Sequence, residues 1–291
     1  MAIRGVLVCV DPSTAGATRL QIAFHLARER KAFLAAGYVF PEEHRGPASP
    51  RVTTTLPVPN DGVVGVAGHG IERARGEVPA AAFEEAVEQQ FRKELEEFGL
   101  DGELHVFATG DTESVTELAK SFDLTIMGQL APGVSARGAL RPEQVLVAAG
   151  RPVLVIPQTS RVASVGKRVL VAWDGSREAV RAVNDALPFL TAAEAVTVIF
   201  VGSPDRALER QKPSIERVIR HLRLHGIEAK LEETLRGDIS VSNTLLSRAA
   251  DLAADLIVAG AYHHSQLREA LVGGVSRELL EHTTIPLLLS H

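Results

Sequence analysis

The stretch VLVCVDPS, Val6–Ser13, returns 163 residues later as VLVAWDGS, Val169–Ser176. Each copy is a short run of apolar residues, rich in valine, that ends in an aspartate and, two residues later, a serine. Continuous apolar runs of this length are typical of strands buried on both faces of a parallel sheet. The repeat therefore predicts two copies of one fold, each opening with a buried strand.

A second pair of matching stretches defines the two copies further. DLTIMG, Asp123–Gly128, recurs as DLIVAG, Asp255–Gly260, only 132 residues later. The first copy must therefore carry about 31 extra residues, and the region 43–76 is dense in glycine and proline and lacks apolar periodicity. This region is predicted to be a long loop or mobile lid. We expect domains at 1–158 and 166–291, joined through the polar stretch Gln158–Lys167.

Short apolar runs alternate with helical patterns in both copies, which predicts two tandem doubly wound, Rossmann-like α/β domains. Each is expected to hold an open, parallel, five-stranded sheet with helices on both faces. The predicted strands are Val6–Val10, Phe33–Phe40, Glu103–Ala108, Leu124–Met127 and Val153–Ile156, then Val169–Trp173, Ala195–Val201, Glu228–Thr234, Leu256–Ala259 and Leu287–Leu289. Two of the intervening helices have readable ends, from Pro79 to Gly99 and from Pro213 to Gly226.

Composition excludes several classes of function. Of 291 residues 45% are hydrophobic and 23% charged, with a formal net charge of −5 and no run of Lys or Arg. This balance argues against a nucleic-acid partner. Cys9 is the only cysteine, so neither a disulfide framework nor a thiolate zinc cluster is expected. The apolar run before Asp11 is too short for a signal peptide or a membrane span, and we expect a cytoplasmic protein without a membrane partner.

Ligands of open parallel sheets bind at the carboxyl ends of the strands, where the strand order reverses. Asp11 and Ser13 follow the first strand, and Asp174 and Ser176 follow its repeat. The serines are expected to cap the helices that follow them. For the aspartates two interpretations stay open, because a carboxylate there can support the turn or accept a hydrogen bond from a ribose hydroxyl.

A glycine-rich segment follows the fourth strand of the second copy. Gly260 leaves room for a ligand near the backbone, and Gly273 and Gly274 stand just before the opening turn of a predicted helix. Free backbone N–H groups and the helix dipole at such a start can bind phosphate. The alternative is a tight turn that serves only chain geometry. In the first copy Ala139-Leu140 replace the glycine pair and Pro142 stands opposite Ser276, so a nucleotide is expected in the second copy.

With these residues the chain resembles the universal stress protein family in its tandem form, over nearly its whole length. The family pattern is glycine, two residues, glycine, nine residues, then glycine followed by serine or threonine. Here it reads Gly260, two residues, His263, nine residues, Gly273 and Gly274. His263 thus replaces the second glycine, and Gly274 replaces the hydroxyl residue. In the first copy only Gly128 survives.

The resemblance implies a nucleotide site in the second copy. Asp174 and the backbone near Val201 would meet the adenosine end, Gly260, Gly273 and Gly274 the phosphates, and Ser276 would supply the missing hydroxyl, while the His263 side chain projects toward the phosphate space. It also suggests that the last strands of the two copies meet in a pseudo-dimer, since an apolar edge strand is unsafe when unpaired. A homodimer of such chains is a further expectation.

The leading hypothesis is a stress-response protein that binds ATP, ADP or AMP, with Mg²⁺ accompanying ATP, and that hydrolyses it very slowly or not at all. No catalytic residue and no metal ligand set is identified, because His263 and His264 lack an acidic or cysteine partner. The rival hypothesis is a scaffold that binds protein partners and no nucleotide. An enzyme of the wider adenine-nucleotide α-hydrolase group is a third, which lacks a visible acid/base pair.

Three other residues are considered as site residues. Arg268 and Arg277 flank the glycine segment and could pair with phosphate or form a solvated helix face. Cys9 lies within the first strand and is expected to be a small buried residue without a nucleophilic role. There is no Gly-x4-Gly-Lys-Ser/Thr, Gly-x-Gly-x2-Gly or Gly-x-Ser-x-Gly motif of an ATPase, dehydrogenase or hydrolase.

Overall fold

A computed structural model describes residues 2–40, 53–56, 80–130, 140–160, 165–202, 207–235, 239–261 and 274–291. The first half contains β1 (Gly5–Val10), α1 (Thr14–Arg30), β2 (Phe33–Phe40), β3 (Thr53–Leu56), α2 (Ala80–Phe98), β4 (Gly102–Ala108), α3 (Thr112–Ala119), β5 (Leu124–Gly128), α4 (Pro142–Ala149) and β6 (Val153–Ile156). The second half contains β7 (Arg168–Ala172), α5 (Arg177–Leu190), β8 (Ala195–Gly202), α6 (Ala207–Leu224), β9 (Ala229–Leu235), α7 (Val241–Asp251), β10 (Leu256–Gly260), α8 (Gly274–His282) and β11 (Leu287–Ser290).

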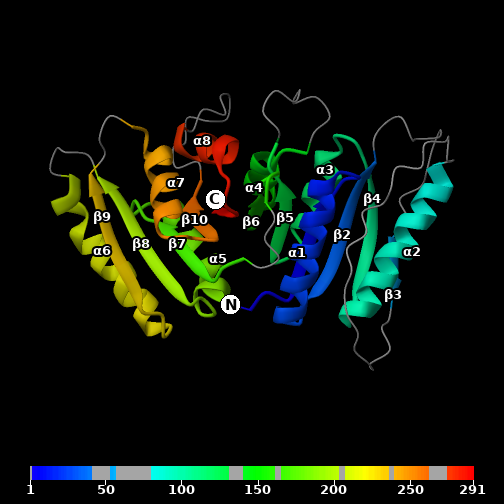
Figure 1. Cartoon of the computed structure of the whole chain (residues 1–291), viewed down its shortest axis with the longest axis horizontal. Helices are drawn as coiled ribbons and strands as arrows, with labels where there is room; N and C mark the ends of the chain where they lie inside the picture. Colours follow the sequence, from blue (N-terminus) through cyan, green and yellow to red (C-terminus); the bar gives the residue numbers. More distant parts are fainter. Residues whose placement is uncertain are drawn as a thin grey trace.

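All described strands belong to one sheet, in the order β3-β4-β2-β1-β5-β6-β11-β10-β7-β8-β9. Within each half the strands β4-β2-β1-β5-β6 and β11-β10-β7-β8-β9 are parallel. Figure 1 shows the two halves side by side, with β6 and β10 near the centre and the helices α2 and α6 toward the two ends. The predicted pair of doubly wound parallel sheets is confirmed.

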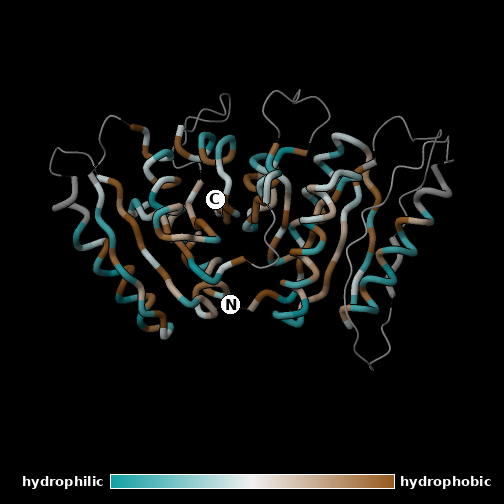
Figure 2. The backbone as a smooth tube through the Cα atoms, viewed as in Figure 1, coloured by the Kyte–Doolittle hydropathy of each residue, from teal (hydrophilic) through white to brown (hydrophobic). Residues whose placement is uncertain are grey.

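The two faces of the sheet carry separate hydrophobic cores. One core takes Val6, Val8 and Val10 of β1 together with the buried faces of α1, α2, α5 and α6. The other takes Leu7 and Cys9 of the same strand together with α3, α4, α7 and α8. Because successive residues of a strand point to opposite faces, a continuous apolar run serves both cores. Figure 2 shows hydrophobic residues concentrated along the strands, whereas α2 and α6 alternate between hydrophobic and hydrophilic.

The strands predicted from sequence are all present, with ends that shift by at most one residue. Helix α2 ends as expected before Gly99, which adopts a left-handed φ of 64°. Val87, Phe91 and Leu95 of this helix are buried in the core. Two details of the prediction are wrong and concern α6 and the 43–76 region.

Pro213 does not start a helix, because α6 begins six residues earlier, at Ala207, and contains Pro213 in its interior. The predicted end of α6 before Gly226 is confirmed, with a φ of 75° at that glycine. The 43–76 region is not loop throughout. Residues Thr53–Leu56 form β3, which pairs antiparallel with β4 at one edge of the sheet. The rest of that region lies outside the described residues.

The two halves meet strand to strand. β11 pairs antiparallel with β6, and the register places Leu288 opposite Leu154. Both side chains are fully buried. This confirms the predicted contact between the last strands and makes the sheet continuous through the pseudo-dimer. Of the helices that the structure describes, none combines the length and the apolar character that a membrane span requires.

Candidate functional site

Each half has one point where the strand order reverses. β1 lies between β2 and β5, and β7 lies between β8 and β10. Asp11 follows β1, beside the end of β5 at Gly128, and Asp174 follows β7, beside the end of β10 at Gly260. The fold therefore places the two predicted aspartates and the two glycines at the ligand-binding edges of a doubly wound sheet.

The serines next to these aspartates are helix caps, as predicted. Ser13 Oγ accepts a hydrogen bond from Gly16 N at 3.0 Å, and Ser176 Oγ accepts one from Ala179 N at 3.0 Å. Their hydroxyls thus satisfy backbone donors that a helix start leaves open. The cap in turn orients the aspartate, whose carboxylate lies two residues earlier.

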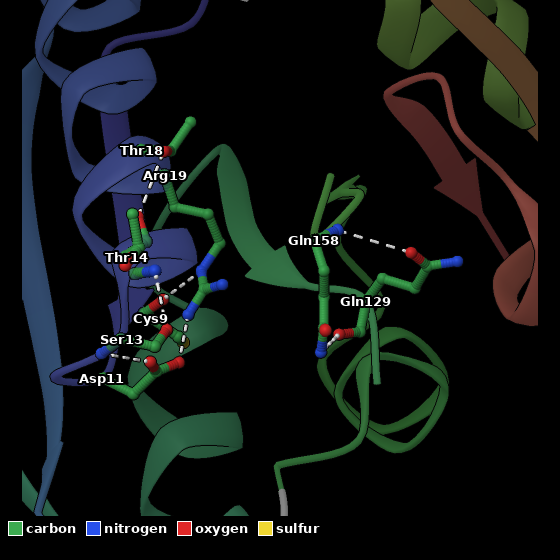
Figure 3. Close-up of polar contacts among 9 residues, drawn as sticks. Cys9, Asp11, Ser13, Thr14, Thr18, Arg19, Gln129 and Gln158 are labelled. Carbon is green, nitrogen blue, oxygen red and sulfur yellow. Dashed lines mark hydrogen bonds and ion pairs between the residues drawn. The ribbon is translucent and has the colours of Figure 1, made fainter. Parts of the chain in front are cut away.

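In the first half the switch point is filled by an arginine that the sequence interpretation missed. Arg19 extends from α1, is 5% exposed, and donates from Nε to Cys9 O at 3.1 Å. Its Nη2 pairs with the Asp11 carboxylate. A Cβ added to Gly128 would lie 2.4 Å from Arg19 Nη1, so the guanidinium covers that glycine. Figure 3 shows Arg19 directed toward Asp11 and Cys9.

This ion pair changes the protonation of its neighbours. Burial alone would raise the pKa of Asp11, but the charge of Arg19 and hydrogen bonds from Ser13 and Arg19 outweigh it, so the pKa is lowered below the usual 3.8. Burial raises the pKa of the Cys9 thiol to about 12, although the positive charge of Arg19 opposes the shift. Cys9 is buried and stays a neutral thiol at physiological pH.

In the second half none of the arginines that the structure describes covers the switch point. The repeat places Ala182 at the position of Arg19, and Ala182 is buried in the core. The Asp174 side chain is exposed, and among the described residues its one hydrogen bond is from Ser176 N to Oδ1 at 2.9 Å. The register of β7 with β8 pairs Ala172 with Ile199. Two residues further along, Asp174 therefore stands level with Val201, the other residue predicted at the adenosine end.

Gly260 is required by the packing of α5. A Cβ on Gly260 would lie 2.5 Å from Ala179 N and 2.5 Å from the carbonyl carbon of Glu178, which are backbone atoms of the first turn of α5. Glu178 was also missed by the sequence interpretation. Its side chain is 2% exposed and pairs with Arg177. A carboxylate in the first turn of a helix is favoured by the helix dipole.

Helix α8 begins where the sequence predicted a phosphate cradle. Gly274 is its first residue, is exposed, and would accommodate a Cβ with no atom of the described residues within 4 Å. Ser276 lies in the same turn and is 9% exposed. One turn further on, Glu278 accepts a hydrogen bond from Ser242 of α7.

Part of the predicted site lies outside the described residues, namely His263, Gly273 and Arg268. Arg277 is described, and its guanidinium pairs with Glu281 on the same helix at 2.7 Å. The part of the chain that the structure describes contains no group of three or more His, Cys, Asp or Glu that could hold a metal ion.

A signal for Arg19 was present in the sequence. Its neighbours on α1 one turn later, Ile22 and Ala23, are apolar and buried, so Arg19 lies on the apolar face of the helix. A long charged residue on such a face needs a partner, and Asp11 is the nearest strand-end carboxylate. Glu178 gave a weaker signal, because an acidic residue in the first turn of a helix is ordinary.

The geometry thus describes a doubly wound α/β protein with two switch points, of which the first is filled by its own arginine. The sequence profile described as "Universal stress protein family" matches residues 166–291. No curated protein sequence matches the chain significantly.

Solved structures match almost the whole chain. A universal stress protein from Archaeoglobus fulgidus has a TM-score of 0.70 and 16% identity, covering 98% of this chain and 97% of its own. A protein of unknown function from Pseudomonas aeruginosa PAO1 has a TM-score of 0.60 and 17% identity, covering 99% and 92%. At these identities the structures establish a shared fold. Residues 166–291 belong to the universal stress protein family, and the first half repeats its fold, which confirms the tandem form.

Proposed function

We propose that the second half of the chain binds an adenine nucleotide at the carboxyl ends of β7, β8 and β10. The observation that carries this proposal is the exposed Asp174 carboxylate at the switch point, whose counterpart Asp11 is occupied by Arg19. A carboxylate in that position can accept hydrogen bonds from the ribose hydroxyls. Val201, level with it at the end of β8, would contact the adenosine end.

The phosphates would lie toward the start of α8. Gly260, His263, Gly273 and Ser276 complete the proposed set, and Mg²⁺ would accompany ATP. The described members of this set form no acid/base pair, and the proposed role is nucleotide binding with very slow or no hydrolysis, in a stress response.

The test is calorimetric titration with ATP and Mg²⁺, and with ADP and AMP, after the ratio of absorbance at 260 and 280 nm has shown the protein to be free of nucleotide. One site per chain is expected. Gly273→Val should abolish binding because side-chain atoms would fill the phosphate space. Asp174→Asn should weaken binding roughly tenfold, as expected when a hydrogen bond to a charged group is lost.

Asp11→Asn is the matched control, because it changes the equivalent carboxylate in the half whose switch point is filled. It should leave nucleotide affinity unchanged. Absence of binding at millimolar nucleotide would overturn the proposal. The rival function, a scaffold for protein partners, would then gain support from the two departures from the family pattern at His263 and Gly274.

A further inference from the structure

Gln129 of the first half contacts the end of α8 in the second half. Its Nε2 donates to Leu280 O at 3.0 Å, Glu281 O at 3.1 Å and Thr283 O at 3.1 Å. The last four carbonyls of a helix lack partners within the helix. A single amide from the other half therefore caps the carboxyl end of α8.

Gln129 is itself held in one orientation. Its backbone N donates to Ile156 O at 2.9 Å. Gln158 N donates to Gln129 Oε1 at 3.4 Å, and Gln158 Nε2 donates to Gln129 O at 3.2 Å (Figure 3). Because Oε1 accepts from a backbone N–H, the amide nitrogen is the end that faces the carbonyls of α8. The cap is thus held in place by Gln129, the residue that directly follows Gly128 at the first switch point.

The described residues of the second half include no equivalent cap. The residue that follows Gly260 is Ala261, which has no side-chain amide to donate. Its backbone N donates to Ser290 O at 2.9 Å, and its carbonyl contacts His291 Nδ1 at 3.0 Å. The carboxyl end of α4 is instead contacted by Arg181 of α5, whose Nη2 donates to Gly150 O at 2.6 Å. The glutamine cap therefore acts on α8 alone.

Helix α8 is short, so its two ends are mechanically linked. Its nine residues span only roughly 13 Å, at a rise of about 1.5 Å per residue. A displacement at Leu280 would be carried to Gly274 and Ser276 at the other end. Ser242 fixes the helix at Glu278, one turn from its start, and Gln129 fixes the far end. These two contacts hold the helix at two points along its length, on either side of the buried Leu279.

We propose that Gln129 is a positioning residue for the phosphate end of the second-half nucleotide site. This rests on the function proposed above. By capping α8 from the first half, Gln129 holds the opening turn of that helix at the place where it meets phosphate. Affinity of the second half for a nucleotide thereby depends on an intact contact with the first half.

The experiment compares the full-length wild type with Gln129→Ala, Gln129→Glu and Arg181→Ala. Titration with MgATP gives the dissociation constant, and hydrogen exchange of α8 amides measures the cap without nucleotide. Gln129→Ala should weaken MgATP binding roughly 2- to 30-fold, the range of coupling through packed contacts. Gln129→Glu should weaken it further, because an acceptor replaces the donor against three carbonyls. Both should accelerate exchange in α8.

Arg181→Ala is the matched control, since it removes a contact between the halves at a helix end that is not part of the site. It should lower the melting temperature without changing MgATP affinity. Wild-type binding that Gln129→Ala leaves unchanged, or that Arg181→Ala weakens equally, would overturn this inference while the proposed function stands. A wild type that binds no nucleotide would overturn both.

Discussion

Gly128 and Gly260 end equivalent strands, but what lies against them differs. A Cβ on Gly260 would contact backbone of α5 at 2.5 Å, whereas a Cβ on Gly128 would contact the end of the Arg19 side chain at 2.4 Å. A side chain can move aside, but the first turn of a helix moves only with its packing. Gly260 thus allows α5 to pack closely against β10, whereas Gly128 leaves room for the Arg19 guanidinium.

Gly260→Ala is therefore expected to lower the free energy of unfolding by about 1–3 kcal/mol, the usual cost of overpacking. Gly128→Ala should cost less, about 1 kcal/mol, because only hydrogen bonds of Arg19 are displaced. Urea unfolding of both variants followed by circular dichroism measures the difference. Equal losses would show that α5 adjusts as easily as the arginine does.

The Asp11–Arg19 pair predicts an acid-sensitive contribution to stability. The pKa of Asp11 in the folded chain lies below its usual 3.8, so the pair stabilises the fold above pH 3.8. That stabilisation is lost as pH falls from 3.8 through the lowered pKa. Asp11→Asn should be less stable than wild type at pH 7, and the gap should narrow below pH 3.8.

Thermal unfolding measured from pH 7 to pH 2.5 checks this prediction. Asp174→Asn is the control, because Asp174 forms no ion pair with the described residues. Curves for wild type and Asp11→Asn that stay parallel down to the lowest pH would show that the ion pair contributes nothing to stability.

At the scale of elements, the sequence predicted strands better than it predicted helix starts or edges. The strands Val6–Val10 and Val153–Ile156 were predictable because burial on both faces demands continuous apolar runs. Pro213 misled because proline suits the first turn of a helix, yet α6 continues ahead of it for six residues. β3 was missed because four residues, TTTL, within a Pro/Gly-rich region give no period.

The candidate site was predictable in part for the same physical reason. Asp174 and Gly260 could be placed because they directly follow buried strands. Arg19 could be suspected as a buried cation from its place on the apolar face of α1, but its contacts with Cys9 O and Gly128 depend on tertiary structure. Gln129 could not be placed, since its partners on α8 lie about 150 residues away and are carbonyls, which any residue type supplies.

Helix α8 offers a direct way to strengthen the proposed site. Gly274 stands where the family pattern has a hydroxyl, and a Cβ there meets no atom of the described residues within 4 Å. Gly274→Ser should therefore restore a hydroxyl at the helix start and tighten MgATP binding about tenfold, the gain typical of a hydrogen bond to a charged group. Gly274→Ala, the control, should stabilise the chain slightly without tightening binding. Titration that gives Ser and Ala the same affinity would rule out a phosphate contact at this position.

For the whole molecule, the seam between β6 and β11 determines how the halves depend on each other. The register Leu287–Val155, Leu288–Leu154 and Leu289–Val153 joins fully buried positions. Neither strand can be left at an open edge without exposing apolar side chains and unpaired backbone groups. The connection of the two copies in one chain guarantees a partner for each edge.

We therefore expect the fragment 166–291, expressed alone, to pair with itself through β11. An antiparallel pair centred on Leu288 keeps each side chain on the same face of the sheet that it occupies in the full chain. Directly opposed residues have Cα atoms about 4.5–5.5 Å apart, within the range of a disulfide. The fragment lacks Cys9, so Leu288→Cys would give it a single thiol. Light scattering should give twice the fragment mass, and mild oxidation of Leu288→Cys should cross-link it.

A folded monomer at micromolar concentration would show that the second half does not need a strand at this edge. A dimer that fails to cross-link would place the contact elsewhere on the fragment. If the fragment dimerises through β11, α8 of each copy still lacks Gln129, because the residue in the equivalent position is Ala261. The fragment should then bind MgATP more weakly than the full chain even with its edge strand paired, which separates the effect of the cap from that of the seam.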